Sequence, residues 1–572
     1  MVASCRDIDT PTVSCPGTVK VFSFGVVVWC AYGDRQFRVD CQLPNDPLSN
    51  QTRLDILSAN GTGGSTMNIG QMKRALGEEL CTWLLAGADL LETEELPEEL
   101  QPLAGLVSQV EAQQKPSPAV MLAMQGEMGA DLGNIRATFG GQLPTLEGAD
   151  DLERLVLQRA LDSYPLLLLH RAASKERWRQ PWSPMWRADF EGGMCELIRN
   201  DPDLGRVFQG SSGFTDLHLK LVSNTGQGGG MQLAVFPGAL FGSAAQLAAL
   251  RGQASAEGFA EAALDLLKLW RTLCRDGAAD VSAYVGLDGV ALPPSVDTIG
   301  LPRATLHRMH AERLGHLDKS AWSTHMNDGT NAPFMAGVIL EVPFQLRVRF
   351  GEEDLSGFMR SDRAYETLAD ASERIALAIL LACGDKPVTV RRAWTTVADP
   401  TGFNLQTGWR QSRSYPRAPR LLSADEAGEI ARWASLLGRT DDANVAVARR
   451  RILGAVGERP DHEDGLIDAI IALENLFGGS TELAFRISAG AAVLLAPPDE
   501  RRQFMREVKD LYNKRSKLVH GQTSLAPAQA AEARDKAVLL VVQALRKLYE
   551  DRPDLLSDKN RSETLLLDAP GT

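Results

Sequence analysis

The sequence lacks long apolar runs, paired cysteines and an excess of positive charge, and each absence excludes a class of protein. The longest clean apolar run, Ile375 to Cys383, is far too short to cross a bilayer. The eight cysteines include no C-x-x-C pair, which argues against a disulfide framework or a zinc knuckle and favours free thiols in a reducing compartment. The net charge of −13 argues against a protein that coats nucleic acid through bulk charge.

Several motifs are missing as well. The chain begins without a basic segment followed by an apolar core, so we expect no signal peptide. No Gly-x-Ser-x-Gly or His-Glu-x-x-His motif occurs, and Gly226 to Gly230 lack the Lys-Ser/Thr of a phosphate-binding loop. We therefore expect no cofactor, no metal and no membrane partner, and we expect a cytoplasmic location.

The length of 572 residues predicts several domains. The fold class that we expect is a multidomain chain, with an α+β N-terminal region followed by an all-α helical bundle. Residues 1–140 are predicted to be an N-terminal α+β region, and residues 141–400 a second α+β region with antiparallel strands. The pattern leaves open whether residues 1–400 form one domain or two.

The clearest strand runs from Val338 to Phe350, where apolar residues alternate strictly and predict one buried face. Shorter alternating segments, 216–221 and 231–236, predict two strands joined by a glycine-rich hairpin loop. Helices are predicted over 259–274 and 364–383, where apolar residues recur on one face.

Residues 401–420 are rich in proline, glycine and arginine and are predicted to be a linker. Residues 421–551 are predicted to be the helical bundle, and residues 552–572 a polar tail. Ser423 and Glu426 have the spacing of a capping box that opens the first helix. Further short helices, which favour an antiparallel bundle, are predicted over 441–456, 462–477, 481–496, 499–518 and 526–549.

Two charged residues lie on apolar faces of this bundle. Arg515 falls on the stripe that Leu511 and Leu518 define, and Glu474 falls on the apolar stripe of the helix over 462–477. Either charge is costly to bury without a partner, so we expect the two to meet.

His520 follows five residues after Arg515, about 500° around an ideal helix, so the two would not share a face of a continuous helix. Gly521 is predicted to end the helix, which would allow the unwinding chain to bring the imidazole toward the guanidinium. An arginine can hold a phosphate through two hydrogen bonds, and a histidine can transfer protons near neutral pH. From Asp499 to Gly521 the seven basic and four acidic residues give a local charge of +3, which would attract a phosphate. The alternative is a structural ion pair, with His520 as a capping group.

Several segments of this region together resemble the Apea-like branch of the HEPN superfamily. The resemblance covers residues 440–550, under a quarter of the chain, and the segments that carry it are Asp464 to Phe477, Arg486, Ala491-Ala492 and Leu511 to Gly521. It implies a helical bundle that forms a homodimer, in which Arg and His of two protomers face one cleft. Many such domains are metal-independent endoribonucleases of defence or toxin systems. Ser516 departs from the pattern, because many active members carry Asn, Asp or His there.

The resemblance assigns roles by position. Arg515 and His520 match the R-x4–6-H pair, and Glu474 matches the acidic position of the earlier helix. His520 would accept the proton of an RNA 2′-hydroxyl, and Arg515, oriented by Glu474, would stabilise the charge that builds on the phosphate. The product would be a 2′,3′-cyclic phosphate. The substrate-binding residues would be Lys514, Ser516, Lys517 and Tyr512, although the lysines also suit a solvated helix face.

The rest of the chain then has a regulatory role in this interpretation, sensing a trigger protein or ligand through the N-terminal region. The rival interpretation is a catalytically inactive RNA-binding or dimerisation bundle, with the activity in the N-terminal region. Other weighed features are the histidine cluster at 307–325, for which surface or structural roles are favoured over metal binding, and the Arg/Trp segment 177–186, which suits either base stacking or a domain interface.

Overall fold

The computed structural model describes most of the chain beyond residue 66 and two short segments before it. The described residues are 28–32, 35–39, 67–113, 128–168, 193–208, 217–310, 313, 337–351, 358, 362–384, 386–402, 404–409, 419–479, 482–522 and 524–567. The chain divides into two compact units, residues 1–65 and residues 66–572. In the first unit, β1 (Val28–Tyr32) and β2 (Arg35–Val39) form an antiparallel hairpin. The domain boundaries expected at 140 and 400 stay predictions.

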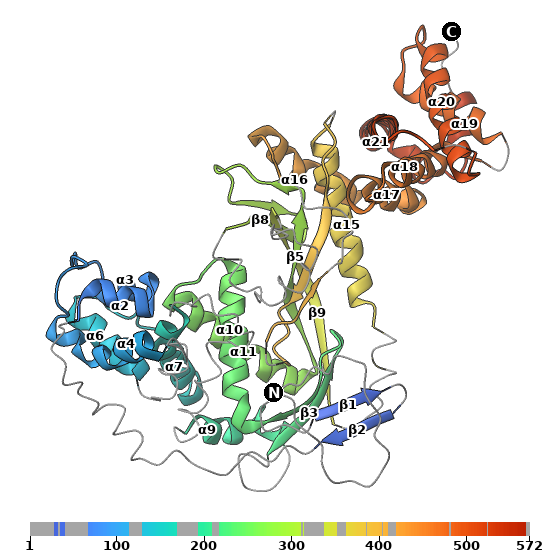
Figure 1. Cartoon of the computed structure of the whole chain (residues 1–572). Coiled ribbons are helices and arrows are strands. Elements are labelled where there is room, and N and C mark those ends of the chain that lie inside the picture. The colour runs from blue at the N-terminus through green and yellow to red at the C-terminus, as the bar shows by residue number, and fades with distance from the viewer. Residues whose placement is uncertain are drawn as a thin grey trace, which may run out of the picture. The chain divides into compact units, whose positions relative to one another are not determined.

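An antiparallel sheet is the β component of the second unit (Figure 1). Its longest strand, β9 (Val338–Phe350), has the predicted bounds and alternates between buried and exposed residues over its second half. The strands that pair directly with β9 are β3 (His218–Ser223), β5 (Ala278–Asp288) and β8 (Ala304–Arg308). The expected mixed α and β fold is therefore confirmed.

Further strands extend this sheet. They are β4 (Gly228–Gln232) on β3, β7 (Thr298–Leu301) on β8, β10 (Arg391–Val397) on β5, and β11 (Thr407–Trp409) on β10. A separate parallel pair joins β6 (Val290–Ala291) to β12 (Arg420–Leu421). The interpretation of residues 401–420 as a linker is thus wrong in part, because two of its segments are strands. Residues 403 and 410–418 lie outside the described residues.

A buried helix replaces one predicted strand. We expected a strand over 231–236, whereas β4 ends at Gln232, a 3-10 turn spans Leu233–Val235, and α10 runs over Phe236–Arg251. A short apolar run cannot be assigned to strand or helix by periodicity when every side of it is buried. Pro237 in the first turn was the signal for a helix start.

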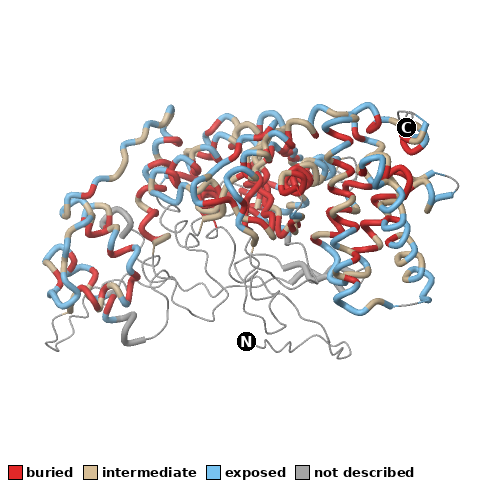
Figure 2. Tube along the Cα trace, turned by 90° about the horizontal axis from the view of Figure 1, so that it is seen from above, coloured by how far each residue is buried: buried red, intermediate tan, exposed pale blue. Residues whose placement is uncertain are grey.

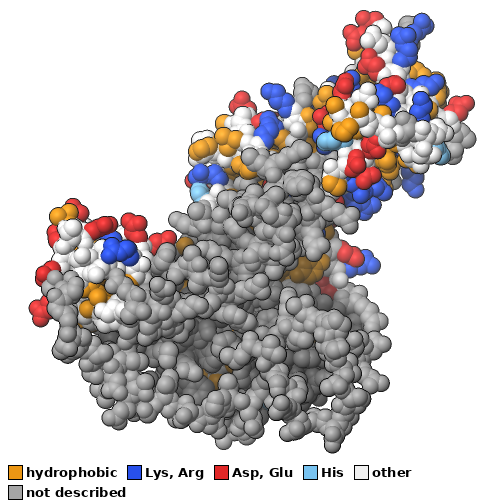
Figure 3. Space-filling view, in the orientation of Figure 1, with side chains coloured by type: hydrophobic (Ala, Val, Ile, Leu, Met, Phe, Trp, Pro, Cys, Tyr) orange, Lys and Arg blue, Asp and Glu red, His pale blue; other side chains and the backbone are white. Residues whose placement is uncertain are grey.

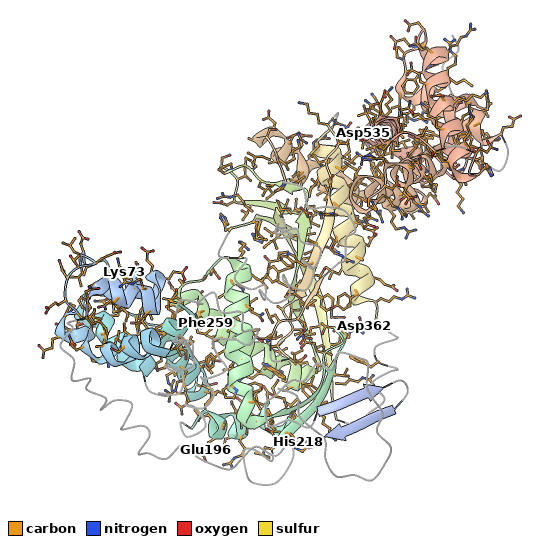
Figure 4. All side chains as sticks on the ribbon, viewed as in Figure 1. Lys73, Glu196, His218, Phe259, Asp362 and Asp535 are labelled. Carbon is orange, nitrogen blue, oxygen red and sulfur yellow. The ribbon has the colours of Figure 1, made fainter. Side chains whose placement is uncertain are left out.

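The helix α10 packs against α11 (Ala256–Asp276), which extends the predicted helix over 259–274 at both ends. The rings of Phe241 on α10 and Phe259 on α11 lie 6.3 Å apart, and Figure 4 labels Phe259. Within the described residues, one helical stretch, Leu233–Arg251, is long and apolar enough to cross a membrane, and 83% of it is buried inside the protein. Such burial is typical of a core helix.

The helices that precede the sheet in the second unit form a Leu-rich cluster with α10 and α11. Their bounds are α2 (Ile69–Leu76), α3 (Glu78–Leu85), α4 (Gln101–Gln113), α6 (Met128–Thr138), α7 (Asp151–Leu168) and α9 (Met194–Asn200). Arg271 of α11 contacts three carboxylates at 2.8 Å, those of Asp150, Glu153 and Asp201. This cluster ties α7 to α11.

The C-terminal helices follow the predicted bounds closely. They are α16 (Ala424–Arg439), α17 (Ala446–Leu453), α18 (His462–Phe477), α19 (Leu483–Leu495), α20 (Arg501–Val519) and α21 (Pro527–Glu550). Ser423 and Glu426 form the expected capping box. Buried and exposed residues alternate along these helices, so that each presents one side to the interior (Figure 2).

The end of the chain does not form the polar tail that we expected from 552 onward. A 3-10 turn (Pro553–Leu556) leads into α22 (Arg561–Leu567), which packs against α19. Leu555 and Leu565 are buried, and the buried guanidinium of Arg561 donates to the backbone carbonyl of Leu476 at 3.0 Å. The sequence did not reveal this helix, because α22 is only seven residues long and too few apolar residues lie on its buried side to set a period.

A buried polar cluster connects the sheet-bearing part to the C-terminal helices. Asp442, 1% exposed, accepts hydrogen bonds from Arg374 of α15 (Ala364–Ala382), from Arg449 of α17 and from the Tyr549 hydroxyl of α21. The helix α15 also packs against β9 and β5. The same helix therefore supports the sheet on one side and the bundle on the other.

Candidate functional site

The predicted end of α20 is confirmed in detail. Its last helical residue is Val519, His520 is the cap residue, and Gly521 adopts a left-handed conformation with φ of 63°. The Gly521 N–H donates to the carbonyl of Leu518 at 3.0 Å, and the Gln522 N–H donates to that of Lys517 at 2.9 Å. These two bonds are a Schellman motif, which fixes the position of His520 at the helix end.

One face of α20 is turned into the bundle. Val508 and Leu511 are buried there, and Phe504 and Leu518 are half-buried beside them. The helix packs against α18, α19 and α21. Arg515 lies on this inner face, so the sequence prediction that a charge sits on the apolar stripe is correct.

The expected partner of Arg515 is present. Its two terminal nitrogens lie 3.4 Å and 3.5 Å from the two carboxylate oxygens of Glu474, near the end of α18. The two side chains are 20% and 21% exposed, and the buried Nε of Arg515 makes no hydrogen bond. The two parallel contacts between the guanidinium and the carboxylate are therefore longer than in a tight ion pair. The Nε of the guanidinium remains an unused donor.

His520 lies on a different side of the same helix. Because it stays in helical register as the cap residue, its five-residue offset from Arg515 places it about 140° around the helix axis. Its side chain is exposed, and no hydrogen bond or ion pair joins it to Arg515 within the described residues. We expected the helix to unwind so that the His520 imidazole approaches the Arg515 guanidinium. This expectation is not met within one chain, because the left-handed residue is Gly521, which follows His520 and does not redirect it.

The solvent face of α20 carries a line of polar and basic side chains that the sequence reasoning missed. Its members, called here the α20 stripe, are Arg502, Arg506, Lys509, Asn513, Lys517 and His520, and all are exposed. Their offsets of 4, 7, 11, 15 and 18 residues from the first member place them on one helix face. The same periodicity that revealed the inner face would have revealed this one. Figure 3 shows Lys and Arg side chains over the surface of the C-terminal helices.

The four predicted substrate-binding residues lie in different settings. Lys517 belongs to the α20 stripe, whereas Lys514 is engaged in an ion pair with Asp510 at 2.8 Å. Ser516 and Tyr512 are half-buried. The structure thus brings Lys517 and His520 together on one face and Arg515, Glu474 and Tyr512 toward the inner side.

An open hollow lies beside Tyr512, between the start of α19 and α20. Its volume is about 570 Å³, and its lining includes Leu483, Phe485, Lys509 and Tyr512. Phe485 is 50% exposed, an unusual exposure for a large apolar side chain, and Leu483 is 36% exposed. The hollow thus combines exposed apolar side chains with the charged groups of Glu482 and Lys509, and its Tyr512 lies one helix turn from Arg515.

Two histidines of the 307–325 cluster have acidic neighbours of their own. His307 bonds to Glu341 on the neighbouring strand at 2.8 Å, and His310 lies 3.6 Å from Asp297. No group of three metal-ligating side chains occurs among the described residues. His316, His325 and the 177–186 segment lie outside the described residues.

No family model, no curated protein and no solved structure matches this chain.

Proposed function

We propose that the C-terminal helices form a HEPN-type, metal-independent endoribonuclease that acts as a regulated toxin or anti-phage defence effector in the cytoplasm. The observation that carries the proposal is the α20 stripe, in which four exposed basic side chains and Asn513 lead to a histidine fixed at the helix end. Such a row follows the backbone of a single strand of RNA, and a histidine at its end meets a phosphodiester bond.

The angular separation of Arg515 and His520 around α20 determines how many protomers a site needs. Since Arg515 and His520 lie about 140° apart around one helix, we propose a homodimer in which each site combines Arg515 of one protomer with His520 of the partner subunit. The exposed apolar residues Leu483 and Phe485, beside Tyr512, support an association surface on this side of the bundle.

The chemistry follows from the groups in such a composite site. Neutral His520 accepts the proton of the RNA 2′-hydroxyl, and the freed oxygen forms a bond to its own phosphorus. The bond from phosphorus to the 5′-oxygen breaks, that oxygen takes a proton from water, and a 2′,3′-cyclic phosphate remains. Arg515, oriented by Glu474, stabilises the phosphate charge in the transition state, and Lys517 holds a flanking phosphate. DNA lacks the 2′-hydroxyl and is expected to stay intact.

The test is cleavage of RNA and of DNA of the same sequence by the full chain in EDTA. The wild type should cut RNA to a cyclic phosphate and leave DNA intact, and His520→Ala should lose activity by roughly 100- to 10,000-fold, the usual contribution of a general base. Lys559→Ala is the matched control, because it removes one exposed charge far along the chain from α20. Equal cleavage by wild type and His520→Ala would remove His520 from the mechanism.

A second function is favoured by one specific observation. Arg515 faces Glu474 inside the bundle and not the solvent face that carries His520. A bundle that binds RNA along the α20 stripe without cutting it, with the activity of the protein in the N-terminal region, accounts for this arrangement. In that case the wild type should bind RNA and leave it uncut, and Arg502→Ala should weaken binding.

A further inference from the structure

The segment Pro553–Leu567, called here the C-terminal segment, contacts several helices of the bundle. The Ser557 carbonyl accepts a hydrogen bond from the Asn444 side chain at 2.7 Å, in the 3-10 turn before α17. On α22, Glu563 pairs with Arg486 of α19 at 2.9 Å. A further contact, to the end of α18, lies in the turn that carries Glu474.

Arg561 makes this contact with α18. The residue is 3% exposed, and its three side-chain nitrogens donate four hydrogen bonds to backbone carbonyls. Two go to the C-terminal segment itself, to Leu555 at 2.6 Å and Leu556 at 3.1 Å. The other two go to α18, to Asn475 at 3.2 Å and Leu476 at 3.0 Å. Burial lowers the pKa of Arg561 below its ordinary value, so keeping this cation inside the protein costs free energy that the four hydrogen bonds offset.

The α18 carbonyls that Arg561 binds belong to the last turn of that helix. The last four carbonyls of a helix have no partner within it. Here the carbonyl of Glu474 accepts from the Gly478 N–H at 2.7 Å, and Arg561 satisfies the next two carbonyls. The Asn475 side chain accepts from the N–H of Ala448 in α17 at 3.0 Å. The backbone that carries Glu474 is therefore fixed by contacts on both sides.

The charge of Arg561 also suits this position. A helix carries a partial negative charge at its C-terminal end, and Glu474 adds a full negative charge to the same turn of α18. The guanidinium of Arg561 offsets this charge at the backbone, while Arg515 contacts the Glu474 carboxylate from α20 at 3.4 Å. Two arginines from different elements thus hold one helix turn, one through its carbonyls and the other through its side chain.

We propose that Arg561 is a positioning residue for the Arg515–Glu474 pair. By holding the last turn of α18, Arg561 fixes where the Glu474 carboxylate lies, and the carboxylate in turn orients the Arg515 guanidinium. This inference rests on the nuclease proposal, because it concerns the same site. It gives the C-terminal segment a role in activity as well as in stability, although Arg561 itself does not touch the RNA.

The test is RNA cleavage by the full chain carrying Arg561→Lys. Lysine keeps the positive charge but offers one nitrogen in place of three, so it cannot hold the four carbonyls together. At a temperature where every variant is fully folded by circular dichroism, kcat should fall about 10- to 100-fold, because displacing a catalytic group by about 1 Å can cost roughly 100-fold. KM for RNA should not change, since the α20 stripe that binds the strand is intact.

Two control variants remove other contacts of the C-terminal segment. Leu565→Ala removes a buried apolar side chain of α22 and so destabilises the segment without removing a hydrogen bond to α18. Glu563→Gln weakens the ion pair with Arg486. Both variants should keep the wild-type kcat when folded. If Arg561 served stability alone, Arg561→Lys would cleave RNA with the same kcat as Leu565→Ala, and that result would overturn the proposal.

Amide hydrogen exchange, read by mass spectrometry, separates this proposal from the nuclease proposal. In Arg561→Lys, peptides that cover the last turn of α18 and residues 511–519 of α20 should exchange faster than in the wild type, because both sides of the Arg515–Glu474 contact loosen. Glu563→Gln should leave both peptides unchanged. If the wild type cuts no RNA, the nuclease proposal fails, whereas faster exchange in both peptides still supports the positioning of the pair. Unchanged exchange over 511–519 overturns the positioning, whatever the activity.

Discussion

Mixing two inactive variants separates a site built within one chain from a site shared by two. The perturbations are Arg515→Gln in one protomer and His520→Ala in the other. In a two-fold symmetric dimer with shared sites, a mixed dimer has one site with both substitutions and one site with neither. Equal amounts with free exchange make half of the dimers mixed, so the expected activity is about one quarter of the wild type.

The structure indicates that neither substitution unfolds the protein. The ion pair of Arg515 with Glu474 is long and about one-fifth exposed, so its loss should cost about 1 kcal/mol. His520 is exposed and its side chain is not part of the Schellman motif, which uses backbone groups alone. Both costs are small beside a total stability of about 5–15 kcal/mol.

The assay is RNA cleavage in EDTA by co-expressed, differently tagged protomers, with each variant alone as the baseline. The tags allow mixed dimers to be purified, in which half of the wild-type activity per dimer is expected. If purified mixed dimers are no more active than the single variants, the shared site is refuted. If the protein is a monomer at assay concentrations and still cuts RNA, the shared site is refuted as well.

Three further predictions concern the sheet, the buried cluster and the α20 stripe. The hydrogen bond from His307 chiefly lowers the pKa of Glu341 from 4.5 to about 2, so the charged carboxylate stabilises the fold above pH 4.5 and does so progressively less as the pH falls toward 2. Glu341→Gln should therefore lower the urea midpoint at pH 7 and approach the wild type near pH 2.5, and a constant difference would contradict this. Asp442→Asn removes one of the two carboxylates that pair with the buried guanidinium of Arg449, the other being Asp370, and should cost about 3 kcal/mol in chemical denaturation, and a cost below about 1 kcal/mol would contradict the cluster's role. Arg506→Ala should weaken RNA binding for all sequences and reduce the salt slope by about 1, whereas Lys559→Ala should change neither.

The periodicity of apolar residues predicted those helices and strands that have one apolar and one polar face. The strand Val338–Phe350 and the helix His462–Phe477 have the predicted bounds, because each has a regular apolar pattern between obvious end signals. The helix α10 was missed because it is buried on nearly all sides and therefore has no polar face to set a period. The short helix α22 was missed because it is stabilised by packing against α19, a contact that local periodicity cannot reveal.

The same distinction holds for the candidate site. The contact between Arg515 and Glu474 was predictable, since each charge was misplaced on its own helix. The direction in which the His520 side chain points could not be predicted, because it depends on whether the helix unwinds before or after that residue. Pairing within the sheet was equally hidden. Tyr284 of β5 and Thr305 of β8 both lie opposite Glu341 of β9, and only the strand register brings these three distant segments together.

The buried helix α10 has a consequence for biosynthesis. It leaves the ribosome before α11, its main packing partner, and its Gln246 side chain accepts a hydrogen bond from Leu405, more than 150 residues later. At about 5–20 residues per second, the last of its covering chain appears roughly 8–30 s afterwards. During that interval part of a long apolar helix is exposed, so newly made chains should bind chaperones until the later residues, Leu405 among them, have packed against it.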